Sequence, residues 1–171
     1  GLGDVYKRQV KIHLPAGQNF STKKGTSGEV LNFEVIHQMP DITKNSNDEW
    51  ESKFTTRNIA LGADINVSHT KNYKGFAGWQ LPREDHWRHD GSIVHKQWGR
   101  VHGLGHTVDG LTIRSKKDYQ YAGLFQQNDI TNNSIIRNIN VTNVDIQTTG
   151  SGDRTGGLAG FSDNIHNSYC L

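Results

Sequence analysis

The stretches 108-VDGLTI-113, 136-IRNINV-141 and 165-IHNSYC-170 decide the fold of this chain. They begin 28 and 29 residues apart, at positions 108, 136 and 165. In each stretch the positions expected to face inward follow a step of three residues and then a step of two, as in Val108, Leu111 and Ile113. Because a plain strand alternates with a period of two, the step of three indicates a corner or a bulge. The repeat therefore predicts short strands separated by corners and stacked coil upon coil.

A second repeated element lies between these stretches. The stretch 121-YAGLF-125 recurs within 156-GGLAGF-161, so that Gly123-Leu124 matches Gly157-Leu158. Leucine is expected to point into the core, while glycine lets a neighbouring coil approach closely. Coils stacked about 4.8 Å apart pair their backbone groups and bury an apolar face that no coil can bury alone.

These repeats predict an all-β fold, a right-handed parallel β-helix or solenoid, with an irregular N-terminal region. In the gapless alignment Asn138 lies over Asn167, and Gly110 occupies the same corner of the first copy. Stacked asparagine amides can hydrogen-bond along such a ladder.

The composition fits this fold and excludes several classes of function. The 171 residues are 33% hydrophobic with a mean hydropathy of -0.71, and 19 of them are glycine. A net charge of +2, spread over scattered Lys and Arg residues, gives no indication of nucleic-acid binding. No apolar run approaches the ~20 residues that a membrane span needs. The single cysteine excludes an intramolecular disulfide framework and a cysteine zinc site.

The chain divides into a lead-in and a coil region. Residues 10–55 are expected to hold strands, including an alternating strand at Leu31, Phe33 and Val35, and a short helix capped by Asn47 or Asp48. Residues 56–171 are expected to form the coils, with a long excursion over 68–97 that ends in a short strand at 92–94. One continuous strand is predicted from an alternating apolar series: Ile59, Leu61, Ala63, Ile65 and Val67.

Residues 58–67 and 98–171 resemble the GLUG repeats of large bacterial surface proteins, adhesins and some surface proteases. The resemblance rests on motifs that occur in order: 98-WGRVHGLGHTVDGLTI-113, 123-GLF-125, 136-IRNINVTN-143, 156-GGLAG-160 and 165-IHNSYC-170. It implies a β-helix but no particular activity, because such a repeat is a structural unit. His102 and Leu104 replace the Asp and Asn of the family pattern, and 68–97 is longer and richer in His and Trp than the usual connection.

Histidines suggest a first kind of site. Five of them cluster in the sequence: His86, His89, His95, His102 and His106. Imidazole is a common metal ligand, but His102 and His106 would share a face only on a helix, which Gly103 and Gly105 disfavour. We therefore interpret these histidines as turn and surface residues, and His106 also matches a position that the resemblance implies is structural.

Carboxylates and aromatic side chains suggest two further kinds of site. A polysaccharide lyase or glycoside hydrolase would need clustered carboxylates, for which the candidates are Asp109, Asp129, Asp145, Asp153 and Asp163. Because the alignment places Asp109 with Arg137 and His166, we interpret the carboxylates as turn residues. A sugar platform could use Tyr119, Tyr121, Phe125 and Phe161, although core or turn packing is the preferred interpretation for the last two.

Other conspicuous residues have simpler interpretations. The glycine-rich 148-TTGSGDRTGG-157 lacks the spacing and the Lys-Ser/Thr ending of a phosphate loop and is expected to be a flexible loop. Residues 115–118 are expected to form a solvated basic turn, and Cys170 to be buried at an inward position. No catalytic residue, metal site or cofactor site is predicted.

We therefore expect a structural or adhesive segment of a secreted bacterial cell-surface protein, without catalysis in this chain. Its partners would be host glycans or proteins bound through loops, and further coils of the parent protein. The alternatives are a carbohydrate-active β-helix enzyme and an accessory domain of a surface protease.

The opening nonapeptide, 1-GLGDVYKRQ-9, differs from the rest of the chain. Residues 4–9 resemble the translation of a transposon end used to prepare sequencing libraries, so residues 1–9 are expected to be translated adapter without specific contacts to the coils. The chain is then expected to be a fragment without end caps, and to be marginally stable and prone to associate.

Overall fold

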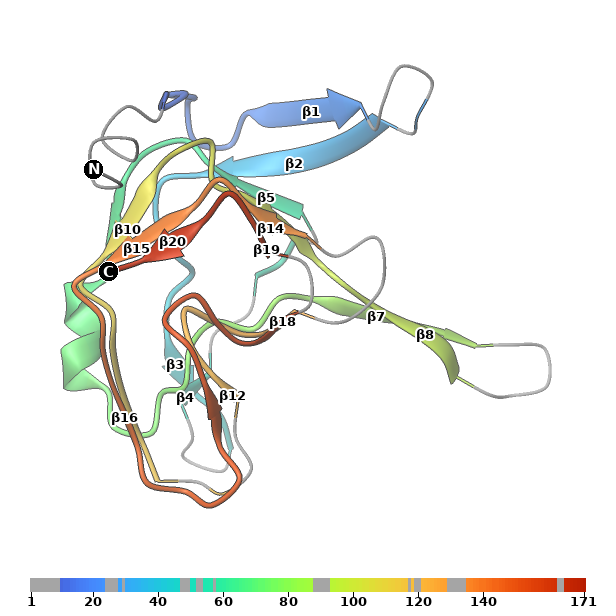
Figure 1. Cartoon of the computed structure of the whole chain (residues 1–171). Helices are drawn as coiled ribbons and strands as arrows, with labels where there is room; N and C mark the ends of the chain where they lie inside the picture. The colour runs from blue at the N-terminus through green and yellow to red at the C-terminus, as the bar shows by residue number, and fades with distance from the viewer. Residues whose placement is uncertain are drawn as a thin grey trace.

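Short parallel strands in stacked sheets make up most of the structure (Figure 1). The computed structural model describes residues 10–23, 28, 30–46, 50–51, 54–56, 58–87, 93–116, 118, 121–128, 135–162 and 165–171. The expectation that residues 1–9 make no specific contacts with the coils concerns residues outside these ranges. No α-helix occurs in the described part of the chain, which has one short 3-10 helix, η1 (Ser68–Asn72).

The largest sheet contains five successive parallel strands. These are β2 (Val30–Ile36), β5 (Asn58–Leu61), β9 (Arg100–His102), β14 (Ile136–Arg137) and β19 (Ile165–His166). Their register places Ile59, Val101, Ile136 and Ile165 in one column. The strand β1 (Asn19–Lys23) pairs antiparallel with β2 and covers that edge of the sheet. Each return of the chain to this sheet therefore begins a new coil.

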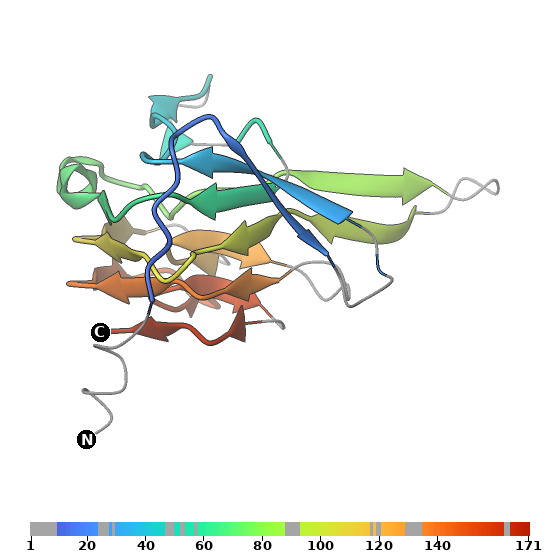
Figure 2. The ribbon, with the colours of Figure 1, turned by 90° about the horizontal axis from the view of Figure 1, so that it is seen from above.

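The other sheets continue each coil. A second parallel sheet holds β6 (Ile65–Asn66), β10 (Thr107–Asp109), β15 (Asn140–Thr142) and β20 (Tyr169–Cys170). Parallel pairs follow: β11 (Thr112–Ser115) with β16 (Asp145–Thr148), β12 (Tyr121–Ala122) with β17 (Arg154–Thr155), and β13 (Phe125–Asn128) with β18 (Ala159–Ser162). Figure 2 shows the coils as layers lying one beside the next. The expected all-β, solenoid-like architecture is thereby confirmed.

Two antiparallel hairpins lie outside the coils and change two predictions. The pair β3 (Thr43–Lys44) and β4 (Trp50–Glu51) occupies the region where a short helix was expected, so that prediction is wrong, although residues 47–49 themselves lie outside the described residues. The pair β7 (Arg83–Trp87) and β8 (Ile93–Trp98) projects from the coils (Figure 1).

The excursion from the coils is shorter than the predicted 68–97. Residues 68–82 belong to the first coil, because Trp79 bridges Phe125 in the next coil and is fully buried. Likewise, residues 59–67 form two strands rather than one. The chain turns a corner between β5 and β6, and Ala63 in that corner is only half-buried.

One predicted register is also wrong. Val108 pairs with Val141 and Ile65, whereas Ile136 pairs with Val101 and Ile165. The stretch 108-VDGLTI-113 therefore lies at a different corner from 136-IRNINV-141. The pairing of Ile136 with Ile165 and of Val141 with Cys170 confirms the 29-residue offset of the other two stretches.

The core runs through the inside of the coils. Its fully buried members include side chains from every complete layer: Ile59, Leu61, Phe76, Trp79, Leu111, Ile113, Leu124, Phe125, Ile136, Ile139 and Val141. The predicted inward positions of Leu124 and Leu158 are confirmed, since both are buried. A second, smaller cluster of Phe33, Val35, Ala60 and Leu104 lies apart from this core, with Leu14, Phe20 and Leu31 packed against it.

Candidate functional site

A segment near the N-terminus, residues 10–14, runs across the corners of two coils. We call it the strap; Figure 2 shows it crossing the layers. The Ile12 N–H donates to the carbonyl of Leu104 at 3.0 Å, and the Leu14 N–H donates to the carbonyl of Gly62 at 3.2 Å. These two carbonyls belong to successive coils, so the strap ties neighbouring layers together.

The buried His106 fastens the strap to the coils. Its side chain is 0% exposed; Nε2 lies 2.7 Å from the carbonyl oxygen of Ile12 and Nδ1 lies 3.2 Å from Oδ1 of Asp64. Each ring nitrogen of His106 thus lies within hydrogen-bond distance of an oxygen, one on the strap and one on the corner of the coil. The His13 ring packs edge-on against the His106 ring, with centroids 4.9 Å apart. His106 is therefore a buried structural residue, and its interpretation as a surface histidine is wrong.

Asp64 also links the strap to the coils. It accepts from Lys11 Nζ at 2.7 Å and from the Thr107 N–H at 2.9 Å. Partial burial opposes ionisation, but the hydrogen bonds from Lys11, Thr107 and His106 outweigh it and lower the pKa of Asp64. The carboxylate thus stays charged and links the strap to the corner on two sides.

We expect Asp64→Asn to loosen the strap. Loss of the charge weakens the contacts with Lys11 and His106, so the amide protons of Ile12 and Leu14 should exchange about 10-fold faster. Asp118→Asn is the matched control, because among the described residues Asp118 accepts a hydrogen bond from the Ser151 N–H alone, at 2.7 Å. Hydrogen exchange measured by NMR checks this, and equal protection in the two variants would contradict it.

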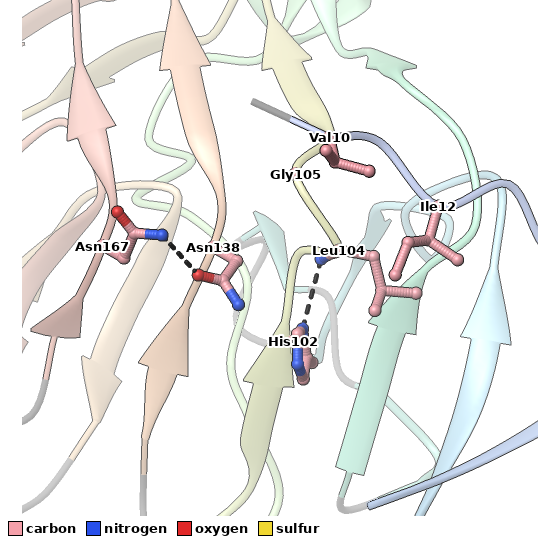
Figure 3. A pocket seen from close by; sticks show the side chains of 7 residues that line it. All are labelled: Val10, Ile12, His102, Leu104, Gly105, Asn138 and Asn167. Carbon is pink, nitrogen blue, oxygen red and sulfur yellow. Dashed lines mark hydrogen bonds between the residues drawn. The ribbon is translucent and has the colours of Figure 1, made fainter. Parts of the chain in front are cut away.

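A groove lies beside the strap (Figure 3). It encloses about 240 Å³ and is lined by Val10, Ile12, His102, Leu104, Gly105, Asn138 and Asn167. Asn167 Nδ2 donates to Asn138 Oδ1 at 2.8 Å, which confirms the predicted asparagine ladder. Both asparagines have positive φ angles, 51° and 46°, a conformation that asparagine tolerates better than most residues.

Gly110 is not part of this ladder. With Val108 paired to Val141, Gly110 falls beside Asn143 at the next corner, where Gly110 has φ 84° and Asn143 has φ 52°. In the groove the layer above Asn138 instead carries Gly103, whose N–H donates to the carbonyl of Arg137 at 2.8 Å. The predicted alignment of Gly110 with Asn138 is therefore wrong.

His102 forms the wall of the groove next to the aromatic rings of Phe20 and Phe33. The centroid distances to these rings are 5.5 and 6.2 Å. Burial, together with the nearby charge of Arg137, lowers the pKa of His102 to about 4. The ring is thus neutral at pH 7, and Nδ1 accepts the Leu104 N–H at 3.2 Å, which leaves the proton on Nε2.

We expect stability to decrease between pH 6.5 and pH 4. In this range the unfolded chain protonates His102 while the folded chain does not, so folding is penalised as the pH falls. His102→Gln should flatten the pH dependence of the melting temperature, whereas His69→Gln, at an exposed histidine, should not. If the melting temperatures of the two variants depended on pH in the same way, the lowered pKa of His102 would not be the cause.

The candidate carboxylates do not converge. Asp109 accepts from Thr142 Oγ1 at 2.6 Å and from Asn143 Nδ2 at 2.7 Å, and it pairs with Thr142 rather than with Arg137. Asp145 forms an ion pair with Arg114 on the neighbouring coil. Asp153 immediately precedes β17, and Asp129 and Asp163 lie outside the described residues. No two described members of the set share a site, so a pair for glycoside hydrolysis is not formed by them.

The aromatic candidates separate into two groups. Phe125 is fully buried in the core, as the preferred interpretation predicted. Tyr121 and Phe161 are half-buried and lie together, with ring centroids 5.7 Å apart. Arg154, which the sequence did not single out, lies over both rings. Tyr119 lies outside the described residues.

The remaining candidates fall in separate places. His86 and His95 are paired in the β7–β8 hairpin, and His89 lies outside the described residues. Within the described ranges, no three His, Cys, Asp or Glu side chains are grouped to hold a metal ion. Of the basic turn, Lys116 and Asp118 are exposed but Ser115 is buried.

Two expectations near the C-terminal coil need correction. Residues 148–157 are not simply a loop, because Arg154–Thr155 form β17. Cys170 pairs with Val141 at an inward position but is exposed, since no further layer lies over it in this structure. Its partial burial raises the pKa of the thiol. The thiol is therefore mostly protonated at neutral pH, which disfavours a role as nucleophile.

Sequence reasoning missed the strap and Arg154. The alternation of Val10, Ile12 and Leu14 was a signal for an extended segment, but nothing in it specified the corners that it crosses. Arg154 stands in a glycine-rich stretch, and only the pairing of Tyr121 with Arg154 brings it to the rings.

The structure and the comparisons add two general findings. No helix in the described part of the chain has the length and apolarity that crossing a bilayer requires. Comparison of the chain with family models, curated proteins and solved structures gave no match.

Proposed function

We propose that this chain is a structural and adhesive segment of a secreted bacterial cell-surface protein, built as a right-handed parallel β-helix of GLUG-type repeats and without catalysis of its own. The coils act as a spacer that displays surface loops and side chains to host glycans or proteins. The resemblance of residues 98–171 to GLUG repeats suggested this role.

The observation that carries the proposal is the unbroken column of five parallel strands, β2, β5, β9, β14 and β19. A stack of this kind buries its apolar side chains internally and leaves long polar faces for display. The separate engagement of Asp109 and Asp145 in contacts between coils supports a structural role for the carboxylates.

Two assays on the purified chain test this proposal. We expect binding to at least one member of a panel of mucins, glycans and host-cell surfaces, and no release of reducing ends or unsaturated products from polysaccharides. Failure to bind any panel member, together with turnover of a polysaccharide, would replace the proposal with a carbohydrate-active enzyme.

A further inference from the structure

The side chains of Tyr121, Arg154 and Phe161 lie together, and Gln127 is the strand partner of Phe161. Tyr121 in β12 pairs with Arg154 in β17, and Gln127 in β13 pairs with Phe161 in β18. Paired residues of parallel strands point to the same side of their sheet. We call Tyr121, Gln127, Arg154 and Phe161 the aromatic–arginine platform.

The geometry of the platform prearranges the guanidinium. The Arg154 Cζ lies 5.8 Å from the centroid of the Tyr121 ring and 5.2 Å from that of the Phe161 ring. Cation–π contacts of this length hold the arginine side chain over the rings. Gly160 keeps the strands close here, because a Cβ at this position would meet the Ala122 nitrogen and the Arg154 carbonyl oxygen.

The polar groups of the platform have no partners within the described part of the chain. Arg154 forms no ion pair or hydrogen bond there, and neither the Tyr121 hydroxyl nor the Gln127 amide is hydrogen-bonded. By contrast, Arg114, on the neighbouring pair of strands, forms an ion pair with Asp145. The platform therefore keeps a cation, a hydroxyl and an amide available to a ligand.

The chemistry of these groups selects a ligand. The part of the half-buried rings that Arg154 leaves uncovered offers an apolar surface to the C–H face of a sugar. The arginine fork matches a carboxylate with two parallel hydrogen bonds. The amide and the phenol can serve neighbouring hydroxyls. We infer that the aromatic–arginine platform binds a carboxylate-bearing sugar of an acidic glycan, an inference that rests on the adhesive function proposed above.

The test compares oligogalacturonate with its fully methyl-esterified form, titrated into the full chain and followed by NMR or calorimetry. We expect the acidic oligosaccharide to bind and the ester to bind at least about 10-fold more weakly, as loss of a charge-assisted pair predicts. Arg154→Gln should weaken binding of the acid by about 10- to 100-fold, and Arg154→Lys should recover only part of it.

Lys116→Gln provides the matched control, since it also removes one exposed positive charge. Tyr121→Phe keeps the ring and should retain most of the affinity, whereas Tyr121→Ala should lose it. Thermal melting confirms that each variant is folded before its binding is compared, and Arg154→Gln, at an exposed side chain, is the decisive variant.

Several results would overturn the inference. These are no binding of oligogalacturonate, equal binding of the ester or of dextran sulfate, or equal losses in Arg154→Gln and Lys116→Gln. If the chain binds mucins or glycans in a way that Arg154→Gln does not alter, the platform fails while the adhesive function stands. Turnover of a polysaccharide would instead reject the proposed function, whatever the platform binds.

Discussion

Replacing Trp79 with alanine is expected to lower the free energy of unfolding by about 3–5 kcal/mol, the usual cost of deleting a large buried aromatic side chain. Trp79 is 0% exposed, bridges Phe125 on the next coil and packs edge-on against Phe76 at 4.9 Å. Its Nε1–H also donates to the carbonyl of Pro40 at 3.0 Å, which joins the lead-in to the first coil. The cavity would thus open where three parts of the chain meet.

Chemical denaturation measures this effect, and Trp79→Phe separates its causes. The phenylalanine variant keeps most of the apolar volume but leaves the Pro40 carbonyl without this donor, so it should lose clearly less stability than the alanine variant. An alanine variant within about 1 kcal/mol of the parent chain would contradict the placement of Trp79 in the core.

Adding one methyl group at Gly123 is the second prediction with a large effect. Gly123 stands in a ladder of glycines, with Gly78 on the preceding coil and Gly156 on the following one. A Cβ at Gly123 would lie 2.5 Å from the Gly156 carbonyl oxygen and 2.9 Å from two further backbone atoms of that coil. Because backbone cannot move aside as a flexible side chain can, Gly123→Ala should force the two coils apart at a cost of about 3 kcal/mol.

Gly75→Ala is the matched control for this substitution. Gly75 has φ 82° and nothing within 4 Å of its added Cβ, so alanine there meets only the strain of the left-handed conformation, about 1 kcal/mol. Denaturation curves of the two variants should differ clearly in midpoint. If Gly75→Ala were the more damaging, backbone crowding between the coils would not be the reason for the glycine ladder.

The sequence identified the stacked coils and part of their register. The 29-residue repeat correctly places Ile136 over Ile165 and Asn138 over Asn167, because these two coils have the same length around that corner. It misplaced 108-VDGLTI-113, because the next corner, at Val141, Val144 and Ile146, has the same step of three and then two. Local spacing cannot distinguish two corners that share it.

The candidate sites were less predictable than the coils. His106 could be named as a candidate from the sequence because imidazole is a common metal ligand. Its contacts, however, are with Ile12 and Asp64, which are 94 and 42 residues away. Likewise, Tyr121 and Phe161 could be named as a platform from the sequence, whereas Arg154 joins them only through the pairing of β12 with β17. Contacts at such separations are fixed by the stacking of coils and leave no local pattern.

By itself, the sequence determined that short β-strands alternate with tight corners and that apolar ladders face inward. These follow from the spacing of Ile, Val, Leu and Gly along the chain, which acts locally. Only the tertiary structure decided how coils of unequal length align. Between Val101 and Val108 the chain has two residues more than between Ile136 and Val141, and the carbonyl of one residue in this longer corner, Leu104, accepts the N–H of Ile12 in the strap. The physical reason is that the coils adopt the register in which backbone hydrogen bonds form between them and the whole apolar column is buried. A gapless alignment of the sequence cannot represent this register, because one corner is longer than the other.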